Sequence, residues 1–343
     1  MNKVCVLGAG SWGTALAVIL ANNGYIVYLW GRPEDGIEEI KVNQENRRFL
    51  PGIDIPVMVK PTINMQEAME GASAIIISIP AQAQREVLQQ AKYCITDSMY
   101  LVNTAKGLEI PTGLRLSQVM EEVLGQGVRE CLAILSGPSH AEEVGKGIPT
   151  AVTVAAYKKE TAYFVQDLFM FDLFRVYTNP DVVGVELGGA LKNVIALATG
   201  VIYGLGYGDN TVAALMTRGL AEIIRMGEAL GGYPRTFAGL SGMGDLVVTC
   251  GSRYSRNRRA GELIGQGKGL EETLQTIGMV VEGVHTTRIL HQLAQKMNVE
   301  MPITEACYNI LYEDKSPRQE VVKLMCRQRK HEMEENAINL NEW

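Results

Sequence analysis

A glycine-rich turn near the N-terminus places the strongest constraint on how this chain folds. Gly8, Gly10 and Gly13 form the pattern GxGxxG, between the apolar run Val4–Gly8 and the helical run Thr14–Leu20. In a strand–turn–helix unit the first glycine permits the turn, the second lets backbone approach a diphosphate, and the third lets helix and strand pack closely. The diphosphate binds the free amides at the helix N-terminus. In this context the turn predicts a dinucleotide-binding unit.

Short apolar runs alternate with helical patterns through the first half of the chain. Runs typical of buried parallel strands follow the first one at Ile26–Trp30, Ala74–Ile79, Tyr100–Asn103 and Leu132–Leu135, and we expect Ala151–Ala155 and Phe174–Tyr177 to extend the sheet. Helical patterns separate several of them, at Gly13–Asn23, Glu34–Gln44, Met65–Met69, Ala83–Tyr93 and Leu114–Leu124. This alternation predicts an α/β fold with a doubly wound Rossmann sheet.

The pattern changes at Thr178–Asp181, where an Asn-Pro pair interrupts it and Asp181 can cap a helix. Long helical patterns with almost no strand signal then follow, at Val182–Tyr203, Val212–Leu230, Arg256–Ile264, Leu270–Ile277, Gly283–Lys296 and Ile303–Leu311. At 343 residues the chain fits two domains. We expect an NAD(P)-binding Rossmann domain over residues 1–180 and an all-helical substrate-binding domain over 181–343, with a frayed end from about Arg329.

Charge and composition exclude several classes of partner. Lysine and arginine total 32 against 38 acidic residues, a net charge of -6, which argues against nucleic acid and anionic membrane surfaces. The apolar stretch Val182–Leu205 resembles a membrane span, but Glu186 and Lys192 near its middle favour a buried helix over membrane insertion. The six scattered cysteines and the absence of a targeting pattern predict a cytoplasmic protein, and the histidine spacing predicts no metal site.

The end of the second predicted strand bears on the choice of cofactor. An acidic residue there normally binds the adenosine ribose, but this chain has Arg32. A guanidinium suits a 2′-phosphate, which favours NADPH. Glu34 can still reach the ribose of NADH, so NADH remains the alternative.

Lys192 is the candidate for proton transfer. Small residues surround it on its helical face, namely Gly188, Gly189, Ala196 and Thr199. They leave space for a ligand, and burial lowers the pKa of an ammonium toward the useful range. Asp245 and Thr249 share a face if their segment is helical, and an aspartate near Lys192 would orient it. The alternatives are a lysine that reaches the surface and a glycine turn in which Asp245 only caps a helix.

A basic cluster precedes the predicted helix Arg256–Ile264, with Ser255 as its cap. Arginines at positions 253, 256, 258 and 259 oppose the helix dipole, which favours anions at this end. A phosphate bound by the free amides and the guanidinium groups would explain them. The alternative is a solvated basic turn.

Two further loops follow predicted strands, at the sheet edge where doubly wound folds bind ligands. Lys106 can donate to a substrate oxygen, unless it is a surface lysine. Ser139 is either a ligand contact or a helix cap. For His140, beside a turn and a cap, we expect a structural or rim role rather than that of the catalytic base.

Together these segments resemble the bacterial NAD(P)-dependent glycerol-3-phosphate dehydrogenases over nearly the whole chain. The matching segments are Gly8–Ala15, Lys106–Leu108, Leu135–Ser139, Gly189–Asn193, Gly244–Leu246, Ser255–Arg259, Val281–Gly283 and Met301–Thr304. The main departure is His140, where the family often has phenylalanine or another residue. The resemblance implies reversible hydride transfer from NAD(P)H to dihydroxyacetone phosphate, giving sn-glycerol 3-phosphate for phospholipid synthesis.

The resemblance also implies residue roles. Lys192 would donate and accept the proton, and Arg256 would meet phosphate or cofactor at the domain cleft. The cofactor would contact Gly8, Gly10, Ser11, Trp12, Gly13, Arg32, Lys106, Ala141, Arg256, Val280 and Glu282. The phosphorylated substrate would contact Lys106, Gly137, Ser139, Lys192, Asp245, Ser255, Arg256 and Asn257.

Two alternatives to this dehydrogenase share the two-domain plan. A ketopantoate-type or β-hydroxyacid reductase also uses a central lysine, but its substrate carries a carboxylate and need not require an arginine-rich helix start. An inactive dinucleotide sensor would lack the buried lysine, whereas Lys192 is present. The sequence leaves the oligomeric state open, with a homodimer as one possibility.

Overall fold

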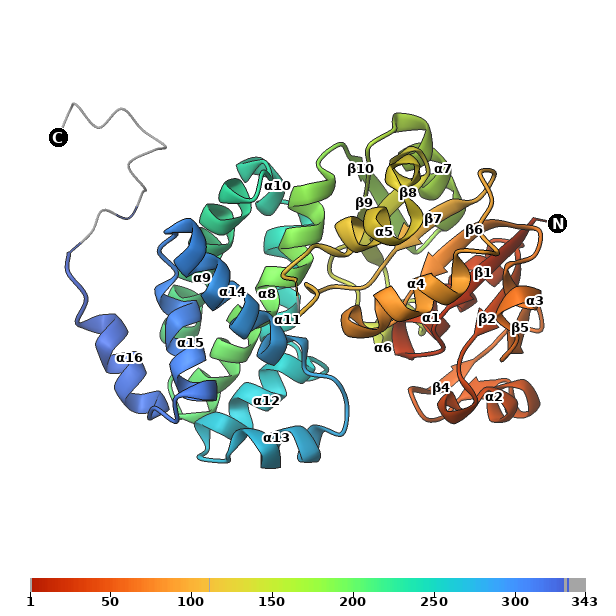
Figure 1. The fold of residues 1–343 in the computed structure, drawn as a ribbon. Helices are drawn as coiled ribbons and strands as arrows, with labels where there is room; N and C mark the ends of the chain where they lie inside the picture. Colours follow the sequence, from red (N-terminus) through yellow and green to blue (C-terminus); the bar gives the residue numbers. More distant parts are fainter. Residues whose placement is uncertain (1, 111, 330–331, 333–343) are drawn as a thin grey trace.

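The computed structural model describes residues 2–110, 112–329 and 332. Figure 1 shows a sheet flanked by helices, formed by the N-terminal half, beside a bundle of helices formed by the C-terminal half. The long helix α8 (Val182–Gly204) lies between the sheet and most of the other helices of the bundle. This is the expected fold class, a Rossmann-like α/β domain followed by an all-helical domain.

The sheet has eight strands in the order β10-β9-β8-β7-β6-β1-β2-β5. Their bounds are β1 Lys3–Leu7, β2 Ile26–Trp30, β5 Val59–Thr62, β6 Ala72–Ile77, β7 Tyr100–Asn103, β8 Leu132–Ser136, β9 Thr150–Ala156 and β10 Phe174–Asn179. Neighbours are parallel except β8 and β9, which pair antiparallel. Leu132–Leu135 was expected to be a parallel strand; this holds for its pairing with β7 and is wrong for its pairing with β9. A parallel crossover usually needs a full helix, and the segment between β8 and β9 contains only the four-residue α6 (Ala141–Val144).

The helices of the first half confirm the predicted alternation, with ends shifted by a few residues. They are α1 Ser11–Asn22, α2 Ile37–Asn43, α3 Met65–Met69, α4 Gln84–Ala91, α5 Leu116–Leu124, α6 and α7 Lys159–Phe169, with 3-10 turns at Pro33–Asp35, Ala81–Ala83 and Gln126–Glu130. Two features were not predicted: strand β5, and the hairpin of β3 (Glu45–Asn46) and β4 (Leu50–Asp54). Pro61 hides β5 from pattern analysis, but an edge strand tolerates proline because one side of it makes no ladder hydrogen bonds.

From Asp181 onward the described residues contain helices and no strand. The helices are α8, α9 Asp209–Ala229, α10 Pro234–Phe237, a π-helical turn Leu240–Gly244, α11 Asp245–Gly251, α12 Arg256–Gly265, α13 Leu270–Ile277, α14 Glu282–Met297, α15 Pro302–Tyr312 and α16 Pro317–Met325. Asp181 caps α8 as predicted, because its Oδ1 accepts from the Gly184 amide at 2.8 Å. Most of the segment expected to fray after Arg329 lies outside the described residues.

Helix α8 is the core of the helical domain and positions the site. It is long and apolar enough to cross a membrane, but its apolar window is completely buried inside the protein. Glycines let α12 cross it at very short range: a Cβ on Gly200 would lie 2.0 Å from the Arg258 carbonyl oxygen, and one on Gly261 would lie 1.9 Å from that of Leu197. This contact holds the start of α12 beside the middle of α8.

Candidate active site

Lys192 lies in the middle of α8 and is only 5% exposed. Its Nζ donates to Asp245 Oδ1 at 2.5 Å and to Thr249 Oγ1 at 2.6 Å. The Thr249 hydroxyl in turn donates to the Asp245 carbonyl oxygen at 2.6 Å, so it offers its lone pair to the lysine. Asp245 and Thr249 do share one face of α11. The alternative of a lysine that reaches the surface was wrong.

Asp245 joins this lysine to a second one from the other domain. Its Oδ2 accepts from Lys106 Nζ at 2.7 Å, and Lys106 also donates to the Gly137 carbonyl oxygen at 2.9 Å. Lys106 follows β7, so its side chain crosses from the sheet domain to α11. It is therefore not a free surface lysine, and Asp245 is not merely a helix cap.

Burial and charge set the protonation of these groups. Burial lowers the pKa of Lys192 to about 8; the negative charge of Asp245 opposes this effect, whereas the positive charge of Lys106 reinforces it. Burial alone would raise the pKa of Asp245, but the two lysines hold it below its usual value. Near neutral pH, Asp245 is therefore a carboxylate, and Lys192 can hold or release a proton within a physiological range.

The loop after β8 wraps the head of Lys106. Gly137 has φ +142°, a conformation that favours glycine, and a Cβ there would lie 3.0 Å from the Val152 Cα. The Gly137 carbonyl oxygen accepts from Ser139 Oγ at 3.0 Å as well as from Lys106. His140, rather than Ser139, is the N-cap of α6, and no side-chain cap bond is found there among the described residues. The interpretation of Ser139 as a helix cap was therefore wrong.

The start of α12 confirms the predicted cap but not the full arginine cluster. Ser255 Oγ accepts from the Arg258 amide at 3.2 Å. Arg256 is exposed and close enough to Glu282 for their charges to interact. Arg258 instead lies over the Tyr203 ring, 4.6 Å from its centroid. The idea that all the guanidinium groups converge on one anion was wrong, because Arg258 packs against α8.

Asn257 ties three helices together. Its Nδ2 donates to Asn193 Oδ1 at 2.8 Å, and its Oδ1 accepts from the Gly283 amide at 2.9 Å. These bonds connect α12 to α8 and to the start of α14. Sequence analysis placed Asn257 only against substrate and overlooked Asn193, although Asn193 directly follows Lys192.

The glycine turn has the geometry that a diphosphate requires. Gly8 has φ +114°, and a Cβ on Gly13 would lie 1.9 Å from the Gly8 carbonyl oxygen, so both positions need glycine for the turn and for helix packing. Gly10 differs, because a Cβ there would meet no described atom within 4 Å. Its missing side chain leaves open space at the start of α1, where Ser11 and Trp12 are the first helical residues. These residues fit a nicotinamide dinucleotide.

Arg32 follows β2 as expected, but it has two acidic neighbours. Its guanidinium pairs with Asp35 at 3.1 Å and with Glu34 at 3.2 Å. The Arg32 side chain remains 60% exposed. This position therefore contains both Arg32, a cation that favours the 2′-phosphate of NADPH, and Glu34, a carboxylate that favours the free ribose hydroxyl of NADH.

Glu282, at the start of α14, lies between the two domains. Its Oε2 is buried without a hydrogen-bond partner in the described part of the chain, and a Cβ on Gly107 would lie 3.1 Å from it. Burial raises the pKa of Glu282 to about 7, although Arg256 and the Ala81 backbone act in the opposite direction. Val280, two residues earlier, is 39% exposed, and Ala141, at the start of α6, is buried. An unpaired buried acceptor here suits a hydroxyl donor of a bound ligand.

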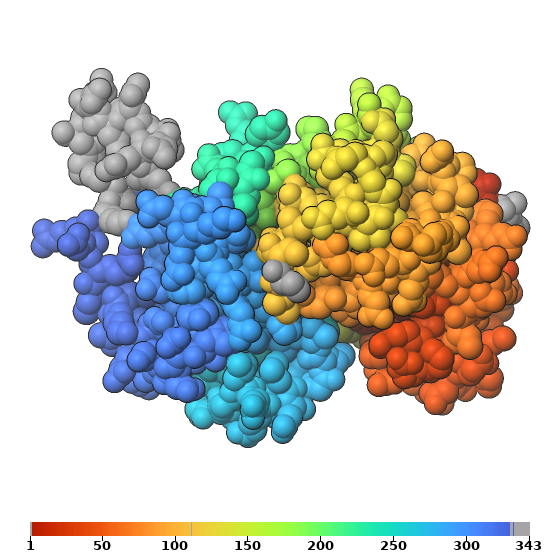
Figure 2. Space-filling view, viewed as in Figure 1, coloured from red at the N-terminus to blue at the C-terminus, as the bar shows by residue number. Residues whose placement is uncertain are grey.

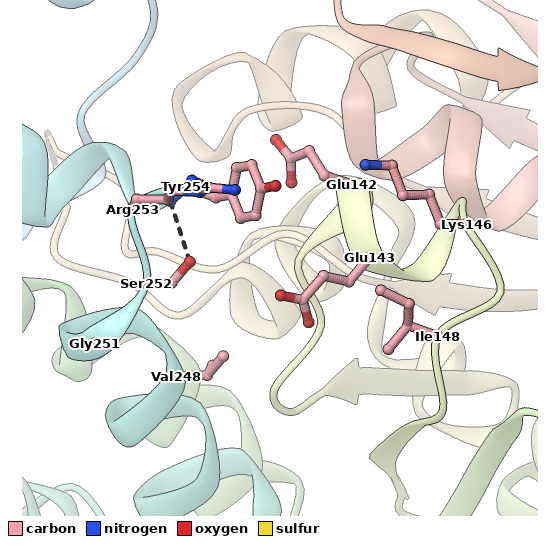
Figure 3. A pocket seen from close by; sticks show the side chains of 9 residues that line it. All are labelled: Glu142, Glu143, Lys146, Ile148, Val248, Gly251, Ser252, Arg253 and Tyr254. Carbon is pink, nitrogen blue, oxygen red and sulfur yellow. Dashed lines mark hydrogen bonds between the residues drawn. The ribbon is translucent and has the colours of Figure 1, made fainter.

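A cavity of about 450 Å³ opens between α6 and the α11–α12 loop (Figure 3). Its lining comprises Glu142, Glu143, Lys146, Ile148, Val248 and Gly251–Tyr254, and neither Lys106 nor Lys192 is among the described residues that form it. The Glu143 carboxylate points into it. The chemistry therefore lies beside this cavity rather than in it. Figure 2 shows a notch between the red and orange N-terminal lobe and the cyan and blue helices.

Known proteins share this arrangement. Residues 3–162 match the family model described as the N-terminus of NAD-dependent glycerol-3-phosphate dehydrogenase, and residues 181–322 match the model of its C-terminus. Glycerol-3-phosphate dehydrogenase [NAD(P)+] of Syntrophomonas wolfei is 60% identical over all of both chains. The chain belongs to the NAD-dependent glycerol-3-phosphate dehydrogenase family. It catalyses the NAD(P)H-dependent reduction of dihydroxyacetone phosphate to glycerol 3-phosphate.

Solved structures separate this enzyme from the alternative reductase. The glycerol-3-phosphate dehydrogenase of Coxiella burnetii is 40% identical, with a TM-score of 0.90 over 95% of this chain and 99% of that one. A ketopantoate reductase from Ralstonia eutropha is 15% identical with a TM-score of 0.58, over 94% and 99% of the two chains. That second similarity shows a shared fold only.

Proposed function

We propose that Lys192 is the group that gives a proton to the substrate oxygen during reduction and takes it back during oxidation. The observation that carries this proposal is its burial beside Asp245 and Thr249 with a pKa of about 8. When bound, the nicotinamide supplies the hydride. Lys192 protonates the alkoxide oxygen that develops on the substrate, and Lys106 stabilises the same charge. Asp245 keeps both ammonium groups oriented.

The start of α12 holds the phosphate in this proposal. The free amides at this helix end and the guanidinium of Arg256 offer donors to a dianion. Ser255 and Asn257 support this helix end, and Gly137 and Ser139 close the opposite side of the substrate. Fixing the phosphate at α12 places the carbonyl near Lys192, which lies on the helix that α12 crosses.

The glycine turn, Arg32 and the Val280–Glu282 segment hold the cofactor, together with Lys106, Ala141 and Arg256. We favour NADPH, because the exposed Arg32 can pair with a 2′-phosphate. Glu34 leaves NADH as the second cofactor. The test is Glu34→Gln, which leaves Arg32 unchanged. We expect this variant to lower the ratio of kcat/KM for NADH to kcat/KM for NADPH. An unchanged ratio would show that Glu34 does not contact the cofactor.

At the cellular scale we propose a cytoplasmic enzyme that supplies glycerol 3-phosphate for phospholipid synthesis. The six cysteines are free thiols, which suits a reducing compartment. We also propose a homodimer, and a boundary between the two domains at residues 180 and 181. Ultracentrifugation tests the first of these, and expression of residues 1–180 tests the second.

The decisive test of the proton assignment is Lys192→Ala. We expect turnover of dihydroxyacetone phosphate to fall by about a hundredfold or more, while NADPH affinity stays near wild type. A matched control is Lys268→Ala, which removes a lysine that pairs with Glu272 on the surface. Turnover that survives in Lys192→Ala would move the proton donor elsewhere.

The phosphate assignment has its own test. Arg256→Ala should raise KM for dihydroxyacetone phosphate about tenfold or more, with a smaller effect on NADPH affinity measured without substrate. Arg258→Ala is the comparison, because that side chain packs on Tyr203. An unchanged KM in Arg256→Ala would place the phosphate elsewhere.

A further inference from the structure

Gln82, in the 3-10 turn Ala81–Ala83 after β6, makes two hydrogen bonds to the backbone that follows Lys106. Its Nε2 donates to the Leu108 carbonyl oxygen at 2.8 Å, and its Oε1 accepts from the Ile110 amide at 2.9 Å. If the side-chain amide were reversed, oxygen would face oxygen and nitrogen would face nitrogen, so one orientation alone satisfies both backbone groups. The roles proposed above give Gln82 no part in the reaction.

The segment that Gln82 holds, residues 106–110, crosses from the sheet domain to the helical domain. The Leu108 side chain is buried in the apolar core of the helical domain, and Ile110 packs against that core. Gln82 itself belongs to the sheet domain. Its amide therefore ties the crossing segment to the sheet domain while the apolar side chains of the same segment are fixed in the other domain.

Lys106 lies between this anchor and the end of β7. On the upstream side, the Thr104 amide and hydroxyl both donate to the Ile77 carbonyl oxygen, at 3.0 and 3.1 Å. On the downstream side, Gly107 packs against the turn that contains Gln82, since a Cβ on Gly107 would lie 2.9 Å from the Ala81 Cβ. Because the peptide links are rigid and few, a displacement of the downstream anchor carries over to the Lys106 backbone.

Arg85 also contacts the crossing segment, but less directly. Its Nε lies 2.7 Å from Glu109 Oε1, and its guanidinium also pairs with Glu122. The Arg85 side chain is 31% exposed, and it holds the segment through another side chain. Gln82 instead binds the backbone itself, on both sides of Glu109, so it constrains the path of the chain more closely.

We propose that Gln82 is a positioning residue that fixes Lys106 against Asp245 by holding the backbone that follows it. The Lys106 ammonium lies 2.7 Å from Asp245 Oδ2 and 2.9 Å from the Gly137 carbonyl oxygen, so a shift of about 1 Å would weaken both contacts. A misplacement of that size can cost about a hundredfold in rate. The inference rests on the proposed role of Lys106 in stabilising the substrate charge.

Gln82→Met tests this, because methionine has a similar length but makes neither hydrogen bond. We expect kcat for dihydroxyacetone phosphate reduction to fall about tenfold or more. The matched control is Gln166→Met in α7, which removes an amide that donates to the Val176 carbonyl oxygen at 2.7 Å within the sheet domain. This control should keep kcat within about twofold of wild type. Thermal midpoints show that both variants are folded at the assay temperature.

A double-mutant cycle shows whether Gln82 acts through Lys106. Lys106→Met should lower kcat about a hundredfold. Adding Gln82→Met to that variant should lower kcat by less than about twofold more, because the ammonium to be positioned is gone. If Gln82→Met keeps wild-type kcat, or lowers it equally in both backgrounds, the inference is wrong. If Lys106→Met itself keeps wild-type kcat, the proposed role of Lys106 fails first, and the inference fails with it.

Discussion

Replacing Asp245 by asparagine should move the pH at which the enzyme loses activity in the reduction direction. The carboxylate touches both Lys192 and Lys106, so the variant removes one negative charge and leaves one buried and one partly exposed ammonium group. Two opposite charges about 4 Å apart interact by about 4 kcal/mol at an effective dielectric of about 20, which equals roughly three pKa units. The asparagine oxygen still accepts a hydrogen bond, so we expect the pKa of Lys192 to fall by about one to three units.

The assay is kcat for NADPH oxidation with saturating dihydroxyacetone phosphate across a pH series. Wild-type kcat should fall as the pH rises through about 8, where Lys192 loses its proton. In Asp245→Asn the fall should begin at least about one unit lower. Glu130→Gln is the control, because it removes a carboxylate that pairs with Lys158 on the surface. An Asp245→Asn profile that keeps the wild-type midpoint would refute the electrostatic argument.

Two further predictions concern stability. Glu222 is buried, and its carboxylate accepts a hydrogen bond from the Ile303 amide at 2.5 Å. Burial raises the pKa of Glu222 to about 7. The folded state therefore retains a proton that the unfolded state loses above about pH 4.5. The free energy of unfolding of the wild type should therefore fall by up to about 3 kcal/mol as the pH rises from about 4.5 to 7. In Glu222→Gln, the unfolding free energy measured with urea should depend less on pH over this range. An unchanged pH dependence would show that Glu222 does not cause it. Glu186→Ala leaves the partly buried Arg115 guanidinium without its 2.9 Å partner and should cost about 2–4 kcal/mol, whereas Glu130→Ala on the surface should cost under about 1 kcal/mol. Equal losses in those two variants would show that the interdomain pair contributes little.

The site was more predictable from the sequence than the edges of the fold. The burial of Lys192 followed from the small residues around it, and the shared face of Asp245 and Thr249 followed from helical spacing. Both are local properties, and the structure confirms both. The antiparallel direction of β9 was not predictable from its apolar pattern, because pairing direction depends on the length of the connection.

Long-range contacts account for the remaining surprises. Asn257 binds Asn193, 64 positions away, and no spacing rule connects them. Glu186 was noticed as a charge inside an apolar helix, but the sequence did not reveal that it accepts from the Ser117 amide at the start of α5. Arg258 belongs to the basic run by sequence, yet the crossing of α8 and α12 directs it to Tyr203.

The central claim is that Lys192 carries the proton in both directions of the reaction. The most direct test measures wild-type kcat against pH for reduction of dihydroxyacetone phosphate and for oxidation of glycerol 3-phosphate. The protonated lysine is needed for the first and the neutral amine for the second, so kcat should fall through about pH 8 in reduction and rise through the same pH in oxidation. Profiles that move in the same direction, or that show no inflection near pH 8, would contradict the account.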